Sequence, residues 1–180
     1  MSDKNANPFS RKLRIETIGE GKSGKVEASP DARNAITRLL DLVALDRLVF
    51  DYGLAPSSGH RLRMTGRLSA SVVQTCVVSL DPVPSELDVP VETEFWPESA
   101  FAALEKTAEA DPGASLLDWP EPIEDGTIDL GKVVYETLAT ALDPYPKKVG
   151  ASFEWQERAA EEGTSAKSGP FAALERLKRQ

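Results

Sequence analysis

Residues 61–78 read RLRMTGRLSASVVQTCVV, and the expected fold is built around this stretch. Apolar and polar side chains alternate along it, which is typical of a strand with one buried face and one wet face. A single strand over the whole stretch would extend about 56 Å at about 3.3 Å per residue, too long for a domain of this size. We therefore expect it to bend or break, as a bulge at Gly66 or where Val72 and Val73 adjoin. The apolar set is Leu62, Met64, Leu68, Ala70 and Val72, and the polar set is Arg61, Arg63, Thr65, Arg67, Ser69 and Ser71.

Three more segments have the composition of strands, residues 12–18, 46–52 and 87–95. The last of them alternates cleanly, with Glu92 and Glu94 on its polar face, and Pro90 indicates an edge strand. The acidic stretch 97–126 is expected to be a loop with one helical turn. Segments rich in Gly, Pro and Ser are expected to be turns, namely residues 20–25, 55–60 and 80–86.

The first predicted helix covers residues 29–45. Ser29 is a suitable N-cap, Pro30 fits the first helical position, and apolar residues recur at helical spacing behind them.

The second predicted helix covers residues 129–142. Asp129 is its N-cap, Leu130 begins an apolar stripe, and the following DPYP ends the helix because Pro144 and Pro146 cannot continue it.

Together these elements predict an α+β fold. We expect a curved antiparallel sheet, either open or barrel-like, with two main helices and a flexible C-terminal tail. The expected organisation is a disordered N-terminus over residues 1–10, a single domain over 11–156, a flexible linker over 157–168 and a short amphipathic tail segment over 169–180.

Composition argues against catalysis. The chain has one cysteine, Cys76, and one histidine, His60, which lies in a Gly/Ser-rich turn. A Ser-His-Asp or Cys-His site would have to use this histidine, and no metal-binding or nucleotide-binding motif is present. We expect no catalytic residue, no metal and no cofactor, and we interpret Cys76 as a small buried hydrophobic residue rather than a reactive thiol. Without a membrane span or a signal-peptide pattern, a cytoplasmic monomer is expected.

Charge is unevenly distributed along the chain. The net charge is −8, and residues 81–125 hold 13 acids against one base. Such a segment repels phosphate and therefore disfavours duplex nucleic acid. Two interpretations remain, a solvated acidic surface or a docking face for a basic partner, with Glu92 and Glu94 as candidate contacts.

Two further regions are candidate contacts. Trp119 lies within the acidic stretch and is either exposed as a contact or packed onto the sheet. The tail segment has an apolar stripe beside basic residues, and a twelve-residue helix is marginal alone. It is therefore expected to fold against its own domain or against a partner, through Phe171, Leu174, Leu177 and Lys178.

The sequence GRLSASVVQTCVVSLDPV from residue 66 to 83 resembles the YceD family, bacterial proteins linked to accumulation of large-subunit ribosomal RNA. Cys76, Leu80 and Pro82 match the family pattern, but Ser79 occupies the position where a second cysteine is frequent. Three further similarities follow in order: an acidic loop, the IDL helix with Asp129, Leu130, Pro144 and Pro146, and the GPFAALERLK tail. The QTCVV and DPYPKK versions look alphaproteobacterial.

The resemblance implies a non-catalytic ribosome-biogenesis factor that supports synthesis, processing or stability of 23S rRNA. Its expected partner is a basic ribosomal protein or assembly factor. One alternative is a protein that binds rRNA directly through a basic strand face formed by Arg61, Arg63 and Arg67. Another is a protein-interaction module unrelated to rRNA.

Overall fold

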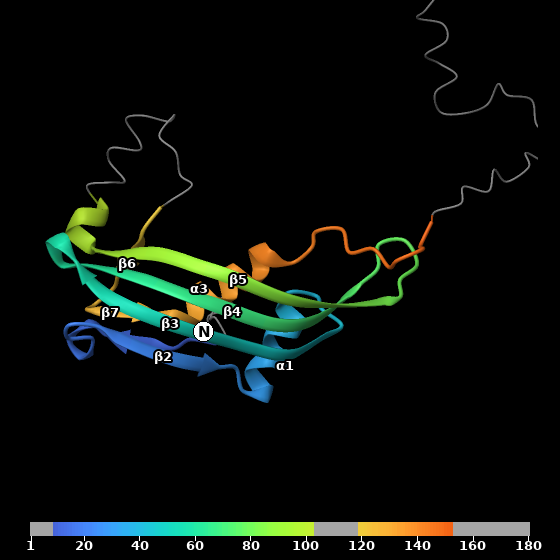
Figure 1. Ribbon diagram of the computed structural model, residues 1–180, viewed down its shortest axis with the longest axis horizontal. Helices are drawn as coiled ribbons and strands as arrows, with labels where there is room; N and C mark the ends of the chain where they lie inside the picture. The colour runs from blue at the N-terminus through green and yellow to red at the C-terminus, as the bar shows by residue number, and fades with distance from the viewer. Residues whose placement is uncertain (1–8, 103–118, 153–180) are drawn as a thin grey trace, which may run out of the picture.

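The computed structural model describes residues 9–102 and 119–152, and Figure 1 shows their arrangement. A five-stranded sheet forms one layer, and helices α1 (Pro30–Leu39) and α3 (Leu130–Ala141) lie on the same face of it. These two helices leave the other face open (Figure 1). The predicted α+β class with two main helices is confirmed. In the described ranges, no helix is both long and apolar enough to cross a membrane.

The sheet is an open layer with the strand order β2-β3-β4-β5-β6. Among the described residues its outer strands, β2 and β6, are not paired with each other, so the sheet does not close into a barrel. Neighbouring strands are antiparallel except β5 and β6, which run parallel. The strands are β2 (Lys22–Glu27), β3 (Ala44–Ser57), β4 (Arg61–Thr75), β5 (Pro82–Pro97) and β6 (Glu121–Ile123).

Strand β4 runs from Arg61 to Thr75 without a register shift at Gly66 and ends three residues before Val78, so the bulge predicted at Gly66 is wrong. The strand is paired with β3 on one side and β5 on the other, and these two ladders hold it extended. A register shift lies in β3 instead, between Leu45 and Arg47, close to the position expected from the adjoining valines. The extra residue is therefore in the partner strand, where a bulge bends and twists the sheet locally.

Gly66 has a packing role. A Cβ at this position would lie 2.6 Å from the carbonyl oxygen of Asp51 and 2.7 Å from the ring of Phe50. Gly66 pairs with Tyr52, and Tyr52 pairs on its other side with Gly24. The two glycines thus make room for the stacked rings of Phe50 and Tyr52, whose centroids are 6.0 Å apart.

The hydrophobic core lies between the inner face of the sheet and the helices. Phe50 from β3, Ile36 from α1 and Leu138 from α3 are all fully buried. The alternation predicted for β4 is confirmed, because its apolar set is buried throughout: Leu62, Met64, Leu68, Ala70 and Val72.

Helix α1 begins as predicted and ends earlier. The Ser29 hydroxyl accepts a hydrogen bond from the Ala32 N–H at 3.3 Å, and Pro30 opens the first turn. The helix ends at Leu39 rather than continuing to residue 45. The Val43 N–H donates to the Val73 carbonyl at 2.8 Å, which draws the chain out of the helix and into the sheet.

The N-terminal segment is held in place from Phe9 onward. Phe9 is 1% exposed, and the Ser10 hydroxyl and the Arg11 N–H each donate to the Asp129 carboxylate at 2.7 Å. The disorder expected over residues 1–10 therefore does not apply to Phe9 and Ser10. The residues before them lie outside the described part.

Several short strands lie where turns or loops were expected. The predicted turn over residues 20–25 contains most of β2, and the predicted turn over 80–86 contains the start of β5. Pairing with a neighbouring strand, rather than intrinsic propensity, makes such short polar segments extended. The acidic loop likewise contains β6, and β7 (Thr127–Asp129) directly follows it. The strand predicted over 12–18 is reduced to β1 (Lys12–Arg14) followed by the 3-10 turn η1 (Ile15–Thr17).

Candidate functional site

On the open face of the sheet, arginines of β4 meet acidic side chains of β5. The Arg63 guanidinium pairs with the Glu92 carboxylate, with Nε 3.0 Å from Oε1. The Arg67 Nη1 lies 2.9 and 3.0 Å from the two carboxylate oxygens of Asp88. The antiparallel register sets Arg63 opposite Glu94 and Arg67 opposite Pro90, so each arginine pairs diagonally with the acid two residues along β5.

Arg61 has an aromatic partner. Its guanidinium carbon lies 3.6 Å from the centroid of the Trp96 ring, within the range of a cation–π contact. The Trp96 Nε1–H donates to Glu94 at 2.9 Å, and the Ser71 hydroxyl donates to Glu86 at 2.8 Å. We use the name charge ladder for Arg61, Arg63 and Arg67 with their β5 partners Trp96, Glu92 and Asp88.

The charge ladder joins the basic residues of 61–67 with the acidic residues of 88–94, which the sequence indicated as two separate candidate surfaces. The three arginines predicted as a basic stripe share the open face, but each is already engaged by β5. The hydrogen bond that Arg63 donates to Glu92 raises the pKa of Arg63, so this guanidinium stays charged. A phosphate group at Arg63 or Arg67 would compete with the carboxylate that is already bound there. The ladder had a signal in the sequence, because residues 61–67 are basic and residues 88–94 are acidic. If the two strands are assumed to pair as a hairpin, these opposite charges become neighbours.

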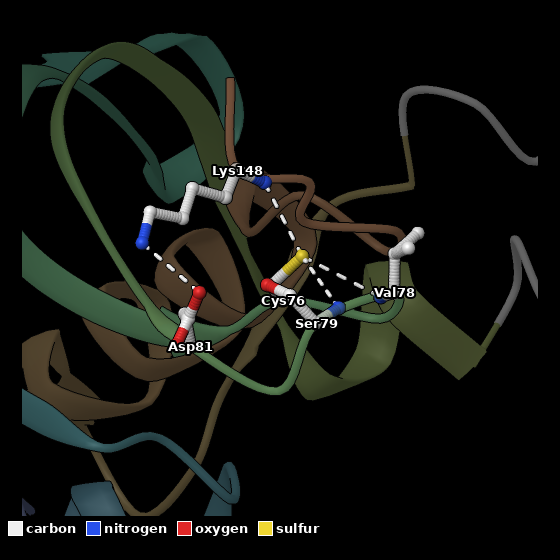
Figure 2. Close-up of polar contacts among 5 residues, drawn as sticks. All are labelled: Cys76, Val78, Ser79, Asp81 and Lys148. Carbon is white, nitrogen blue, oxygen red and sulfur yellow. Dashed lines mark hydrogen bonds and ion pairs between the residues drawn. The ribbon is translucent and has the colours of Figure 1, made fainter. Parts of the chain in front are cut away.

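At one end of the sheet, Cys76 directly follows the last residue of β4 and begins a tight turn (Figure 2). Its Sγ atom is completely buried and accepts hydrogen bonds from three backbone N–H groups. The Val78 and Ser79 N–H groups lie 3.4 Å from the sulfur, and the Lys148 N–H lies 3.3 Å from it. The predicted burial of this cysteine is confirmed, but the three N–H donors around its sulfur differ from the purely apolar environment that was expected.

Further contacts tie the Cys76 turn to the segment that follows α3. The Val77 N–H donates to the Pro146 carbonyl at 2.9 Å, and the Gln74 side chain donates to the Asp143 carbonyl at 2.9 Å. The Lys148 ammonium also pairs with the Asp81 carboxylate at 2.9 Å (Figure 2). The structure thus brings together two motif regions that are far apart in sequence, Cys76, Leu80 and Pro82 with Pro144 and Pro146.

The other two motif residues, Asp129 and Leu130, lie at the opposite end of α3. The Asp129 carboxylate caps the helix by accepting from the Gly131 N–H at 2.9 Å. The same carboxylate accepts from Ser10 and Arg11, so it also fastens the N-terminal segment. The predicted N-cap is confirmed, and its role is structural.

Hydrogen bonds to the sulfur favour the thiolate form of Cys76. The Lys148 N–H has the largest effect, followed by the Ser79 hydroxyl and N–H, and together they lower the Cys76 pKa to about 6, although burial opposes the shift. The Lys148 ammonium lowers the pKa of Asp81 in the same junction.

We expect this thiolate to make stability depend on pH. The pKa of Cys76 is about 6 when folded and close to its ordinary value of 9.0 when unfolded, so the unfolded chain binds more protons between these pH values. Stability should therefore rise from pH 6 to pH 9 and be lost as pH falls back through 6. The measurement is the midpoint of unfolding by guanidinium chloride, determined at several pH values for wild type and for Cys76→Ala. The absorbance of the thiolate in the folded wild type follows the titration of Cys76 directly. A midpoint difference that stays constant with pH would contradict the shift.

The described residues contain neither a His–Cys dyad nor a cluster of metal ligands. His60 and Cys76 flank the 15 residues of β4 at opposite ends, about 50 Å apart, so they cannot form a dyad. No group of three potential metal ligands occurs in residues 9–102 and 119–152. A pocket of about 100 Å³ between β6, β7 and α3 has room for little more than water, and its Lys132 ammonium already pairs with Glu121 at 2.6 Å.

Of the remaining candidate contacts, Trp119 lies in the described part of the chain and the tail residues lie outside it. Trp119 is half-buried and packs edge-on against Phe101, with ring centroids 6.0 Å apart. The tail residues Phe171, Leu174, Leu177 and Lys178 and the linker before them lie outside the described residues. Their proposed contacts stay predictions.

One comparison with known proteins identifies the family. A family model described as large ribosomal RNA subunit accumulation protein YceD matches residues 64–178, more than half of the chain. The chain belongs to the YceD family. The YceD match begins inside β4, includes the Cys76 turn and α3, and extends to Lys178 in the tail. Neither the curated proteins nor the solved structures include a match to this YceD protein.

Neither the exposure nor the backbone conformation of Leu80 was predicted from the sequence. This motif residue is 76% exposed and has a backbone φ of 62°, a left-handed conformation that bulky side chains rarely adopt. Nothing in the spacing of the motif indicates either property, because both depend on how the turn is held from the other side by residues 143–148.

Proposed function

We propose that this YceD protein supports accumulation of large-subunit ribosomal RNA in the cytoplasm by binding a protein partner, without catalysing a reaction. The observation that carries the proposal is the family match over residues 64–178, whose description names rRNA accumulation. In the described residues no cluster of metal ligands occurs, and a binding role requires none. The open face of the sheet offers a broad surface suited to a macromolecular partner.

A protein partner is favoured over direct rRNA binding by the charge ladder. Affinity for nucleic acid depends on cations that neutralise phosphates, and the ladder arginines already contact acids or an aromatic ring. Residues 81–102 hold six acids and no base. On the open face, Glu86 and Glu94 accept hydrogen bonds from the neutral donors Ser71 and Trp96. The Glu94 charge also acts on Arg63 opposite it, so Glu86 is the acid whose charge is more available to a basic partner.

The proposal can be tested by depleting the protein in its source organism and restoring it with variants. Depletion should lower large-subunit rRNA relative to small-subunit rRNA, and wild type should restore the ratio. The charge-reversal variant E86K/E94K should restore it less well and capture less of the partner. Glu20→Lys is the control, because Glu20 is an exposed acid in the turn before β2 and is not part of β5, and it should behave as wild type.

An unchanged rRNA ratio after depletion would overturn the role itself. Crosslinks from rRNA to Arg61, Arg63 or Arg67, together with affinity that falls steeply with salt, would instead favour direct RNA binding. Full activity of E86K/E94K in a folded protein would remove the acidic contact from the proposal.

A further inference from the structure

Exposed apolar side chains gather at the end of the sheet where Cys76 lies. Val77 is 53% exposed, Leu80 76%, Tyr145 75% and Val149 99%. Only two other large hydrophobic residues of the described part are as exposed, Leu39 and Val43. We use the name end patch for Val77, Leu80, Tyr145 and Val149. Exposed apolar side chains that gather in this way indicate an interaction site.

The end patch is held in a defined shape. Its two segments, residues 76–81 and 143–149, are joined by the Val77 N–H bond to Pro146, the Lys148 N–H bond to the Cys76 sulfur and the Lys148–Asp81 ion pair. Figure 2 shows the sulfur and the ion pair at the centre of this junction. These bonds fix the backbone conformation of both segments of the end patch.

Leu80 carries two energetic penalties at once. Its φ of 62° is unfavourable for a branched side chain, and its 76% exposure keeps an apolar surface in water. A polar residue or a glycine would avoid both penalties in a free turn. Strain that persists at such a position points to a contact that the turn presents.

The chain leaves the described part beside the end patch. Ser152, the last described residue, follows Val149 by three positions. A coil of the 19 residues from Ser152 to Phe171 has an end-to-end distance of about 24 Å, which brings the tail segment within reach of the patch. A segment tethered this closely has an effective concentration on the order of millimolar.

We propose that the end patch is the docking site for residues 169–180 of the same chain. Phe171, Leu174 and Leu177 recur every third residue and would form one apolar stripe on a helix. A twelve-residue helix is marginal in water, so it needs an apolar surface to fold against. The end patch supplies that surface, and the family match spans both the patch and the tail up to residue 178.

The test attaches a nitroxide to the cysteine that Gln180→Cys introduces in the 180-residue chain. It then measures the paramagnetic broadening of backbone amide signals. Labelling of wild type checks that buried Cys76 does not react. We expect broadening at Val77, Leu80 and Val149 and little at the far end of β4, near His60. Leu80→Ser or Leu174→Ser should weaken docking about tenfold or more, because each removes a buried leucine contact.

Leu39→Ser is the matched control, since Leu39 is a similarly exposed apolar residue on α1, and it should leave the broadening unchanged. Absence of broadening at the patch, or broadening centred on the open face of the sheet, would overturn the proposal. Broadening in a mixture of isotope-labelled protein and separate nitroxide-bearing protein would show that a second copy supplies the tail, and would also overturn it. The measurement uses the isolated protein, so its outcome is independent of the rRNA role.

Discussion

Replacing Gly131 with alanine is expected to destabilise the protein by about 3 kcal/mol, at the upper end of what overpacking usually costs. A Cβ on Gly131 would overlap the carbonyl oxygen of Phe9 and lie 2.6 Å from its carbonyl carbon. These are backbone atoms, so no side-chain rotation relieves the clash. Alanine favours a helix over glycine by only about 1 kcal/mol, and the steric term therefore wins.

The expected response to Gly131→Ala is separation of the N-terminal segment from α3. That segment is held by the Leu130 N–H bond to the Arg11 carbonyl at 3.1 Å and by the bonds to Asp129. Denaturant unfolding measures the loss, and hydrogen exchange at Arg11 locates it. Gly53→Ala is the control, because its Cβ would meet nothing closer than the Thr65 hydroxyl at 3.8 Å. Equal midpoints for the two variants would contradict the close packing of Phe9 on α3.

Replacing Phe50 with alanine is expected to cost about 3–5 kcal/mol of unfolding free energy. The ring is 0% exposed, stacks on Tyr52 and covers the backbone at Gly66. Removal of the ring leaves a cavity, because Gly66 has no side chain that could fill the space. The paired strands are rigid and close this cavity only in part. The measurement is denaturant unfolding of the purified variant.

Leu39→Ala serves as the control for Phe50→Ala, because Leu39 is 55% exposed and its truncation should change stability by no more than about 0.5 kcal/mol. The coupling between Phe50 and Gly66 can be measured in the same experiments. Gly66→Ala should cost less in the Phe50→Ala background than in wild type, since one of its two clashes is gone. Additive losses would show that the ring does not lie over the glycine.

Both variants act on the layer that positions the candidate surfaces. Phe50 supports the centre of the sheet whose open face carries the charge ladder. Gly131 lies at the start of α3, and the end of α3 leads into the segment that holds the Cys76 turn. Loss of either contact is therefore expected to disturb binding surfaces that neither residue touches.

Some of the fold followed from local patterns. The period-two alternation of residues 61–72 determined which side chains of β4 are buried, since a strand directs successive side chains to opposite faces. Ser29, Pro30 and Asp129 marked two helix starts, because capping depends on a few adjacent residues. The motifs between residues 66 and 178 were also sufficient to identify the family.

Other features depended on which segments meet. The short strands β2, β6 and β7 have little intrinsic preference, and their partners make them extended. The charge ladder required the register between β4 and β5, which converted a basic stripe and an acidic row into paired neighbours.

The YceD motif around Cys76 has some features that follow from its sequence and others that depend on the tertiary structure. Its residue types alone indicated a strand that ends in a turn and a cysteine without a partner cysteine. Only the tertiary structure brought Lys148 and Pro146 to that turn, surrounded the sulfur with backbone N–H groups and left Leu80 strained and exposed. The reason is that periodicity and capping act within a few residues, whereas these contacts join positions about 70 residues apart that meet only after the sheet and α3 have packed.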